Sequence, residues 1–124
     1  MAIEVTLVPE LTPTVTAAAD LSAHKNKFVQ VLAAGVYLAD VRSAGFTGNY
    51  VLQNDPASGE TCSVAGGPSV AKVIAGEAVT RGQGVQCMSA TGLAAITSHG
   101  NAAFAGTAWS TVAGSGEYLA VKLR

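Results

Sequence analysis

The residues that could do chemistry are few, and they are dispersed along the chain. There are two histidines, His24 and His99, and two cysteines, Cys62 and Cys87. A nucleophilic enzyme needs a base beside its nucleophile and a third group that orients the base. His99 follows Ser98 in a polar turn, where a histidine is most often solvated, and the chain has no Gly-x-Ser-x-Gly elbow. We therefore expect no catalytic residue and no enzymatic activity; a hydrolase that uses His99 is the least favoured alternative.

Metal and cofactor sites have no better basis. The cysteines form no CxxC pair, and cysteine and histidine never fall at the spacing of metal ligands. The Gly-Gln-Gly run at 82–84 lacks the third glycine and the following helix of a dinucleotide-binding loop, which favours a turn. We expect no cofactor and no metal, with Cys62 and Cys87 as buried free thiols. The carboxylates are scattered singly: Glu4, Glu10, Asp20, Asp40, Asp55, Glu60, Glu77 and Glu117.

Composition limits the partners. Seven basic and eight acidic residues give a formal charge of −1, so neither nucleic acid nor a membrane surface is an expected partner. Only 12% of the 124 residues are charged, and the mean hydropathy is +0.37. Permanent contacts between subunits would bury part of such an apolar surface. A compact Ala/Gly-rich monomer is the alternative. The start of the chain has no signal-peptide pattern, and we expect synthesis in the cytoplasm.

Short apolar or alternating runs between Gly, Asn, Asp and Ser clusters predict an all-β fold, a compact barrel or sandwich. The last run shows the pattern, because Leu119, Val121 and Leu123 share one face while Tyr118 and Lys122 share the other. The predicted strands are 27–32, 35–39, 50–53, 61–64, 71–74, 84–88, 93–96, 103–109 and 118–123.

Residues 1–26 carry prolines and isolated apolar residues without a strand partner, and they predict an extended N-terminal arm before a β domain at 27–124. Alternation in the arm suits the addition of a strand to the sheet edge of a partner. The candidate contacts of this arm are Ile3, Val5, Leu7, Pro9, Leu11 and Pro13.

An internal repeat constrains the body. At an offset of 57, Gly35 aligns with Gly92, and the Ser-Gly-Glu run at 58–60 aligns with that at 115–117. We expect two similar halves, a β-tulip-like arrangement, that together bury enough surface for one domain. Chance similarity in an Ala/Gly-rich chain is the alternative.

The few aromatic residues have no basic residues interleaved among them, so base stacking is not indicated. Trp109 is either part of the core or an anchor at a subunit contact. We take Trp109, Tyr118 and Tyr50 as candidate residues of a protomer interface.

Four segments along the chain share a recognisable pattern: YVLQNDPASGE at 50–60, KVIAGEAV at 72–79, AFAGTA at 103–108 and GEYLAVKLR at 116–124. These segments resemble those of tailed-bacteriophage capsid cement and head-decoration proteins. The sequence departs from the family pattern at Tyr50, Cys62 and Trp109, which leaves loop and interface details open.

The resemblance implies a structural virion protein on the outer surface of the expanded head. Such a protein binds the major capsid protein, cements neighbouring subunits and stabilises the head against the pressure of packaged DNA. We expect a homotrimer, with a homodimer as the main competitor. The alternative function is a small β-barrel binding module for carbohydrate or a host surface.

Overall fold

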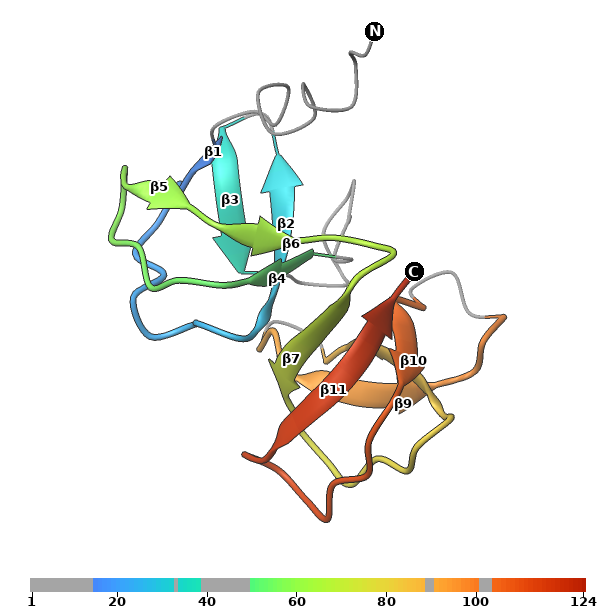
Figure 1. Cartoon of the computed structure of the whole chain (residues 1–124). Helices are drawn as coiled ribbons and strands as arrows, with labels where there is room; N and C mark the ends of the chain where they lie inside the picture. The colour runs from blue at the N-terminus through green and yellow to red at the C-terminus, as the bar shows by residue number, and fades with distance from the viewer. Residues whose placement is uncertain (1–14, 33, 39–49, 89–90, 101–103) are drawn as a thin grey trace, which may run out of the picture.

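The computed structural model describes residues 15–32, 34–38, 50–88, 91–100 and 104–124. Within these ranges the protein is all-β, as predicted, and its antiparallel sheets pack together into a compact body (Figure 1). No helix in the described ranges is long and apolar enough to cross a membrane.

The strands fall into a first and a second half along the chain (Figure 1). The first half holds β1 (Val15–Thr16), β2 (Phe28–Leu32), β3 (Gly35–Leu38), β4 (Tyr50–Leu52), β5 (Thr61–Cys62) and β6 (Val64–Ala65). The second half holds β7 (Val70–Ile74), β8 (Gly84–Cys87), β9 (Ala94–Thr97), β10 (Gly106–Ala108) and β11 (Tyr118–Leu123). The sheet orders are β3-β2-β4-β6 and β7-β11-β10-β8-β9, with β1 and β5 as a separate pair.

All nine predicted strands are present, with two changes. The run 61–64 is divided at Ser63 because Cys62 pairs with β1 whereas Val64 pairs with β4. Of the run 103–109, the described part, 104–109, is strand only over β10. β1 was not predicted, since two residues are too few to show a strand pattern.

The described part of the segment assigned to the arm belongs to the body. Val15 pairs with Cys62, and Ala17 and Leu21 are buried in the core of the first half. The Asn26 N–H donates to the Leu52 carbonyl at 2.8 Å. This corrects the boundary expected at residue 26: single apolar residues between turns supply core contacts that leave no periodic signal. The candidate arm contacts, Ile3, Val5, Leu7, Pro9, Leu11 and Pro13, lie outside the described residues.

The two halves share one pattern of strand pairing. The pairs β1–β5, β2–β3, β2–β4 and β4–β6 recur as β7–β11, β8–β9, β8–β10 and β10–β11. The register recurs as well, with a shift of 56 to 58 positions. Val15↔Cys62 becomes Val73↔Leu119, and Leu52↔Val64 becomes Ala108↔Val121. The expected internal repeat is therefore visible in the fold.

The turns repeat with the strands. The Gly59 N–H donates to the Ala17 carbonyl at 2.8 Å, and the Gly116 N–H donates to the Ala75 carbonyl at 2.8 Å. Both glycines have positive φ, 85° and 91°, a conformation that favours glycine. Asn26, with φ of 67°, takes the place that Gly82 holds in the second half.

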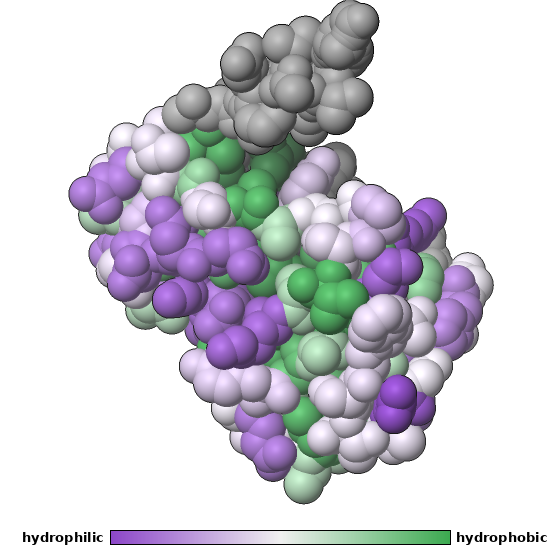
Figure 2. All heavy atoms as spheres, in the orientation of Figure 1, coloured by the Kyte–Doolittle hydropathy of each residue, from purple (hydrophilic) through white to green (hydrophobic). Residues whose placement is uncertain are grey.

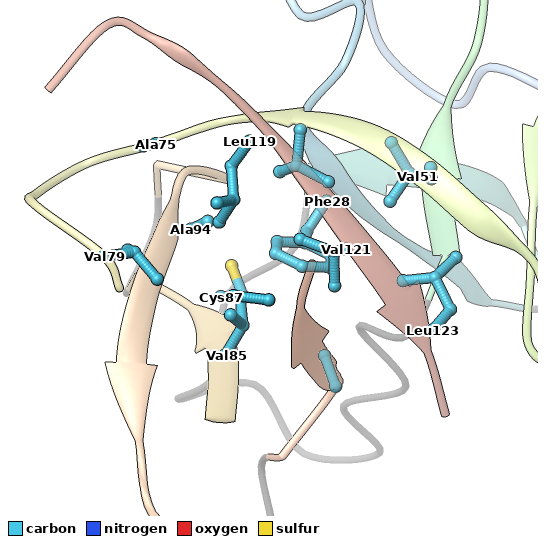
Figure 3. Packing of buried hydrophobic residues seen from close by; sticks show 14 of the residues in the cluster. Phe28, Val51, Ala75, Val79, Val85, Cys87, Ala94, Leu119, Val121 and Leu123 are labelled. Carbon is cyan, nitrogen blue, oxygen red and sulfur yellow. The ribbon is translucent and has the colours of Figure 1, made fainter. Parts of the chain in front are cut away.

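Each half has a buried cluster, and two first-half residues join the cluster of the second. Phe28 and Val51 pack with Val85, Val121 and their neighbours (Figure 3). The Phe28 N–H also donates to the Gly92 carbonyl at 2.7 Å, and the Ile74 N–H donates to the Asn26 carbonyl at 2.9 Å. The first half keeps its own cluster around Val29, Val36 and Leu52. The two halves are thus joined by a shared core and by backbone hydrogen bonds.

Candidate functional site

The outer side of the five-stranded sheet carries a group of exposed or half-buried apolar and cationic side chains. We call this group the aromatic face. It consists of Val70, Lys72, Trp109, Tyr118, Ala120 and Lys122. Trp109 is 54% exposed, Tyr118 57% and Val70 46%. Such exposure is unusual for large apolar side chains, because their burial would remove much apolar area from water.

Strand alternation produces this face. Ala71, Val73, Leu119 and Val121 point into the core, so their neighbours on β7 and β11 point outward. Lys72 is opposite Ala120 and Val70 is opposite Lys122. Trp109 follows β10 directly, and its N–H donates to the Ala120 carbonyl at 2.8 Å.

An open groove of about 420 Å³ runs over this region, between the strands and the Ser110 loop. Its lining includes Val70, Lys72, Ser110, Tyr118 and Ala120. Figure 2 shows the corresponding contrast: pale and green residues are common over the second half, whereas hydrophilic residues gather on the first half in this view.

The charges of the aromatic face are positive. The Lys72 ammonium lies 4.8 Å from the centre of the Tyr118 ring, within the range of a cation–π contact. Both side chains are nevertheless exposed. Lys122 contributes a second cation to the same side of β11. The face therefore combines aromatic area with positive charge.

The three residues predicted for a protomer interface occupy two places. Trp109 and Tyr118 belong to the aromatic face, and the exposure of Trp109 shows that it is not a core residue. Tyr50, 37% exposed, belongs to the four-stranded sheet, where its ring lies against Gly66.

His99 lies in the second half, in contact with Phe104 and Thr107. Its ring packs on Phe104, with centroids 5.0 Å apart, and its Nε2 lies 3.5 Å from the Thr107 hydroxyl. His99 lines an open pocket of about 470 Å³ together with Gln83, Gly84, Ile96 and Thr97. This lining is mainly apolar and backbone.

The other titratable groups have local explanations. The Ser22 hydroxyl and N–H donate to the Asp20 carboxylate, which lowers the pKa of Asp20. Partial burial, followed by the charge of Lys27, lowers the pKa of His24. Burial raises the pKa of the Cys62 thiol. Cys62 and Cys87 are both buried, as expected, and they form no disulfide. No three His, Cys, Asp or Glu side chains in the described ranges gather in a way that could hold a metal ion.

The sequence did not indicate Val70 and Lys72 as members of this face. The alternation of 118–123 already placed Tyr118 with Lys122 on one side of a strand. Lys72 joins them only through the pairing of β7 with β11. That pairing joins distant parts of the chain, and the sequence of neither strand specifies the strand with which it pairs.

Comparisons with known proteins identify one relevant fold. No protein-family model matches the chain, and no curated protein sequence matches it. Among solved structures, the crystal structure of the head fiber gp8.5 N base in bacteriophage phi29 matches with a TM-score of 0.67 and 15% identity. The match covers 90% of this chain and 92% of the other. The two chains share a fold.

Proposed function

We propose that this protein is a structural component of a tailed-phage head. It binds the outer surface of the expanded capsid and cements neighbouring major capsid protein subunits, and it has no enzymatic role. The observation that carries the proposal is the fold shared with the phi29 head fiber base over 90% of the chain. The resemblance of residues 50–60, 72–79 and 116–124 to cement proteins points independently to the same structure.

The physical properties of the chain support this role. Only 12% of its residues are charged, and large apolar side chains remain exposed on a rigid β body. An oligomer that contacts several coat subunits gains effective concentration with each added contact, so weak single contacts are sufficient. Such contacts stabilise the assembled shell by mass action, because they are absent from its separated subunits.

The arm has a narrower extent in this proposal. Residues 15–26 are part of the body, so the segment available to reach coat subunits is 1–14. The alternation of Ile3, Val5 and Leu7 with polar residues suits strand addition at a partner's sheet edge. A segment of this length can span at most about 50 Å when fully extended.

The protein acts as an oligomer, a homotrimer at three-fold and quasi-three-fold positions; a homodimer at two-fold positions is the competing arrangement. Trp109 and Tyr118 are suited to a contact between protomers, since aromatic residues dominate the energetics of protein interfaces.

The test is binding to expanded, undecorated heads. The purified protein is expected to bind in a saturable manner and to raise the temperature at which the heads disrupt. Absence of binding to heads would refute the proposal. Deletion of residues 1–14 is expected to leave the body folded and to weaken head binding strongly. Full affinity in this deletion variant would exclude the arm from the mechanism.

A second function is favoured by one observation. Trp109 and Tyr118 are both exposed beside an open groove, as a platform for sugar rings would require. The protein would then be a binding module for carbohydrate or a host surface. Glycan binding that is lost in Trp109→Ala, without any binding to heads, would support this function instead.

A further inference from the structure

The aromatic face can be compared with the same positions in the first half. Trp109 is the counterpart of Gln53, since the Gln53 N–H donates to Ser63 as that of Trp109 donates to Ala120, at 2.7 and 2.8 Å. Tyr118 is the counterpart of Thr61, since Tyr118 pairs with Ile74 as Thr61 pairs with Thr16.

A second pair of hydrogen bonds confirms this alignment. The Ser63 N–H donates to the Asn54 side chain, and the Ala120 N–H donates to the Ser110 hydroxyl, both at 3.0 Å. The same backbone thus carries polar residues in one half and aromatic residues in the other. The fold does not require Trp109 or Tyr118, so their exposed rings are explained by contact with another molecule.

The first half, in turn, carries acidic residues at positions where the second half has none. Asp20 and Asp55 flank the hydrogen bond from the Leu21 N–H to the Pro56 carbonyl, 2.9 Å long. The equivalent bond of the second half joins Val79 to Val112, at 3.2 Å, and is flanked by Ala78 and Thr111. The two aspartates are therefore specific to the first half.

Small residues lie close to these aspartates in the chain. Ala19 and Ala57 are exposed, and a side chain at Gly59 would meet no atom within 4 Å. We call Ala19, Asp20, Asp55, Ala57 and Gly59 the acidic turn pair. It offers carboxylates beside an open, low surface on which an aromatic ring can lie.

We propose that the aromatic face of one copy docks on the acidic turn pair of the next copy. Trp109 and Tyr118 cover the small residues, while Lys72 and Lys122 approach Asp20 and Asp55. The contact is head-to-tail, because the two surfaces belong to different halves of the chain. Repetition of a head-to-tail contact closes into a ring when the rotation permits. The inference rests on the self-association in the proposed function and assigns its two surfaces.

Charge favours this occupant over a symmetric contact. Two aromatic faces placed against each other would bring lysines against lysines, and like charges across an interface oppose association. An acidic turn pair supplies the opposite charge to the same lysines.

The first experiment replaces the aromatic residues by those that the first half uses in the same place. Trp109→Gln/Tyr118→Thr introduces the two side chains that the equivalent backbone positions carry in the first half. We expect the oligomer measured by light scattering to dissociate at a protein concentration at least about 100-fold higher than for the wild type, because loss of two anchors weakens an interface by this order. The matched control is Ile96→Thr, which removes another exposed apolar side chain, 41% exposed, outside the aromatic face.

The second experiment tests the pairing of the surfaces by charge reversal. Lys72→Glu/Lys122→Glu is expected to abolish the oligomer, and so is Asp20→Asn/Asp55→Lys, in which the new amide at position 20 retains an oxygen for the Ser22 N–H. Combining all four substitutions is expected to restore the oligomer at least in part, because the new carboxylates of one copy again meet a cation, at position 55 of the next copy. Failure of this rescue while both partial variants dissociate would overturn the pairing.

The readouts separate this inference from the proposed function. A wild-type protein that stays monomeric at all concentrations overturns the inference, whether or not it binds heads. An unchanged oligomer mass in Trp109→Gln/Tyr118→Thr, with head binding lost, also overturns it, because the aromatic face would then contact the coat. Loss of the oligomer with the control unchanged supports it.

Discussion

The two halves of this protein use one frame of hydrogen bonds with different side chains. Where the first half has Gln53 and Thr61 on its outer side, the second has Trp109 and Tyr118. Residues that make the frame, such as Gly59 and Gly116, keep their type and their positive φ. The fold therefore requires these glycines, whereas the side chains on the outer sides of the sheets differ between the halves.

The two halves also differ in which of two facing positions carries the large side chain. Tyr50 lies against Gly66 in the first half, whereas their counterparts are Gly106 and Leu123, which pair in the second. A large residue faces a small one in both cases, with the order reversed. Packing at this position therefore depends on the pair, and single substitutions should affect the halves differently.

The largest effect is expected at the junction. Phe28, fully buried, has Gly84 as its counterpart and packs into the core of the second half. Phe28→Ala should lower the free energy of unfolding by about 3–5 kcal/mol, as truncation of a buried aromatic residue does. Urea denaturation followed by circular dichroism measures this loss. A loss below about 1 kcal/mol would show that the halves are held together elsewhere.

A smaller effect is expected at Gly106. A Cβ at this position would lie 2.8 Å from the Cγ1 of Val121 and would also collide with the carbonyl oxygen of Lys122. Gly106→Ala should therefore cost about 3 kcal/mol of stability, the upper range of overpacking. The matched variant at the counterpart, Tyr50→Ala, should cost only about 1 kcal/mol, since this ring is partly in water. Equal losses in both variants would contradict the exchange of sizes.

Sequence patterns predicted much of this architecture. The alternation of 118–123 predicted β11 and its two faces, and the repeated Ser-Gly-Glu run predicted the two matching turns. β1 was missed because its two residues form a strand only through pairing with Cys62 and Thr61. The body therefore begins earlier in the chain than the position expected at residue 27.

The full extent of the repeat was hidden by changes in loop length. β2 and β8 are related by a shift of 56 positions and β3 and β9 by 58, since Val29↔Leu38 corresponds to Val85↔Ile96. A single offset of 57 therefore matches only parts of each half. The aromatic face could be predicted only in part for a related reason: Tyr118 and Lys122 share a strand, but Lys72 joins them through long-range pairing.

Backbone conformation provides a third comparison. Asn26 has a φ of 67° where the second half has Gly82 with a φ of 94°. Asn26→Ala should lower stability by about 1–2 kcal/mol, because residues with a Cβ are strained in this region and asparagine tolerates it best. Asn26→Gly should change stability by less than about 0.5 kcal/mol, because glycine adopts a positive φ without strain but loses more backbone entropy on folding. Thermal denaturation of the two variants measures the difference, and a greater loss in Asn26→Gly would contradict it.

The smallest effect is expected in the repeated turns. The Glu60 carboxylate accepts a hydrogen bond from the Ala57 N–H at 2.8 Å, and the Glu117 carboxylate accepts one from the Ala113 N–H at 3.4 Å. Both glutamates are exposed, so the hydrogen-bond length is the main difference between them. Glu60→Ala should then cost about 1 kcal/mol and Glu117→Ala clearly less, because a hydrogen bond weakens as it lengthens. Urea denaturation of both variants would measure this order, and the reverse order would show that the turn of the second half depends more on its glutamate than the frame implies.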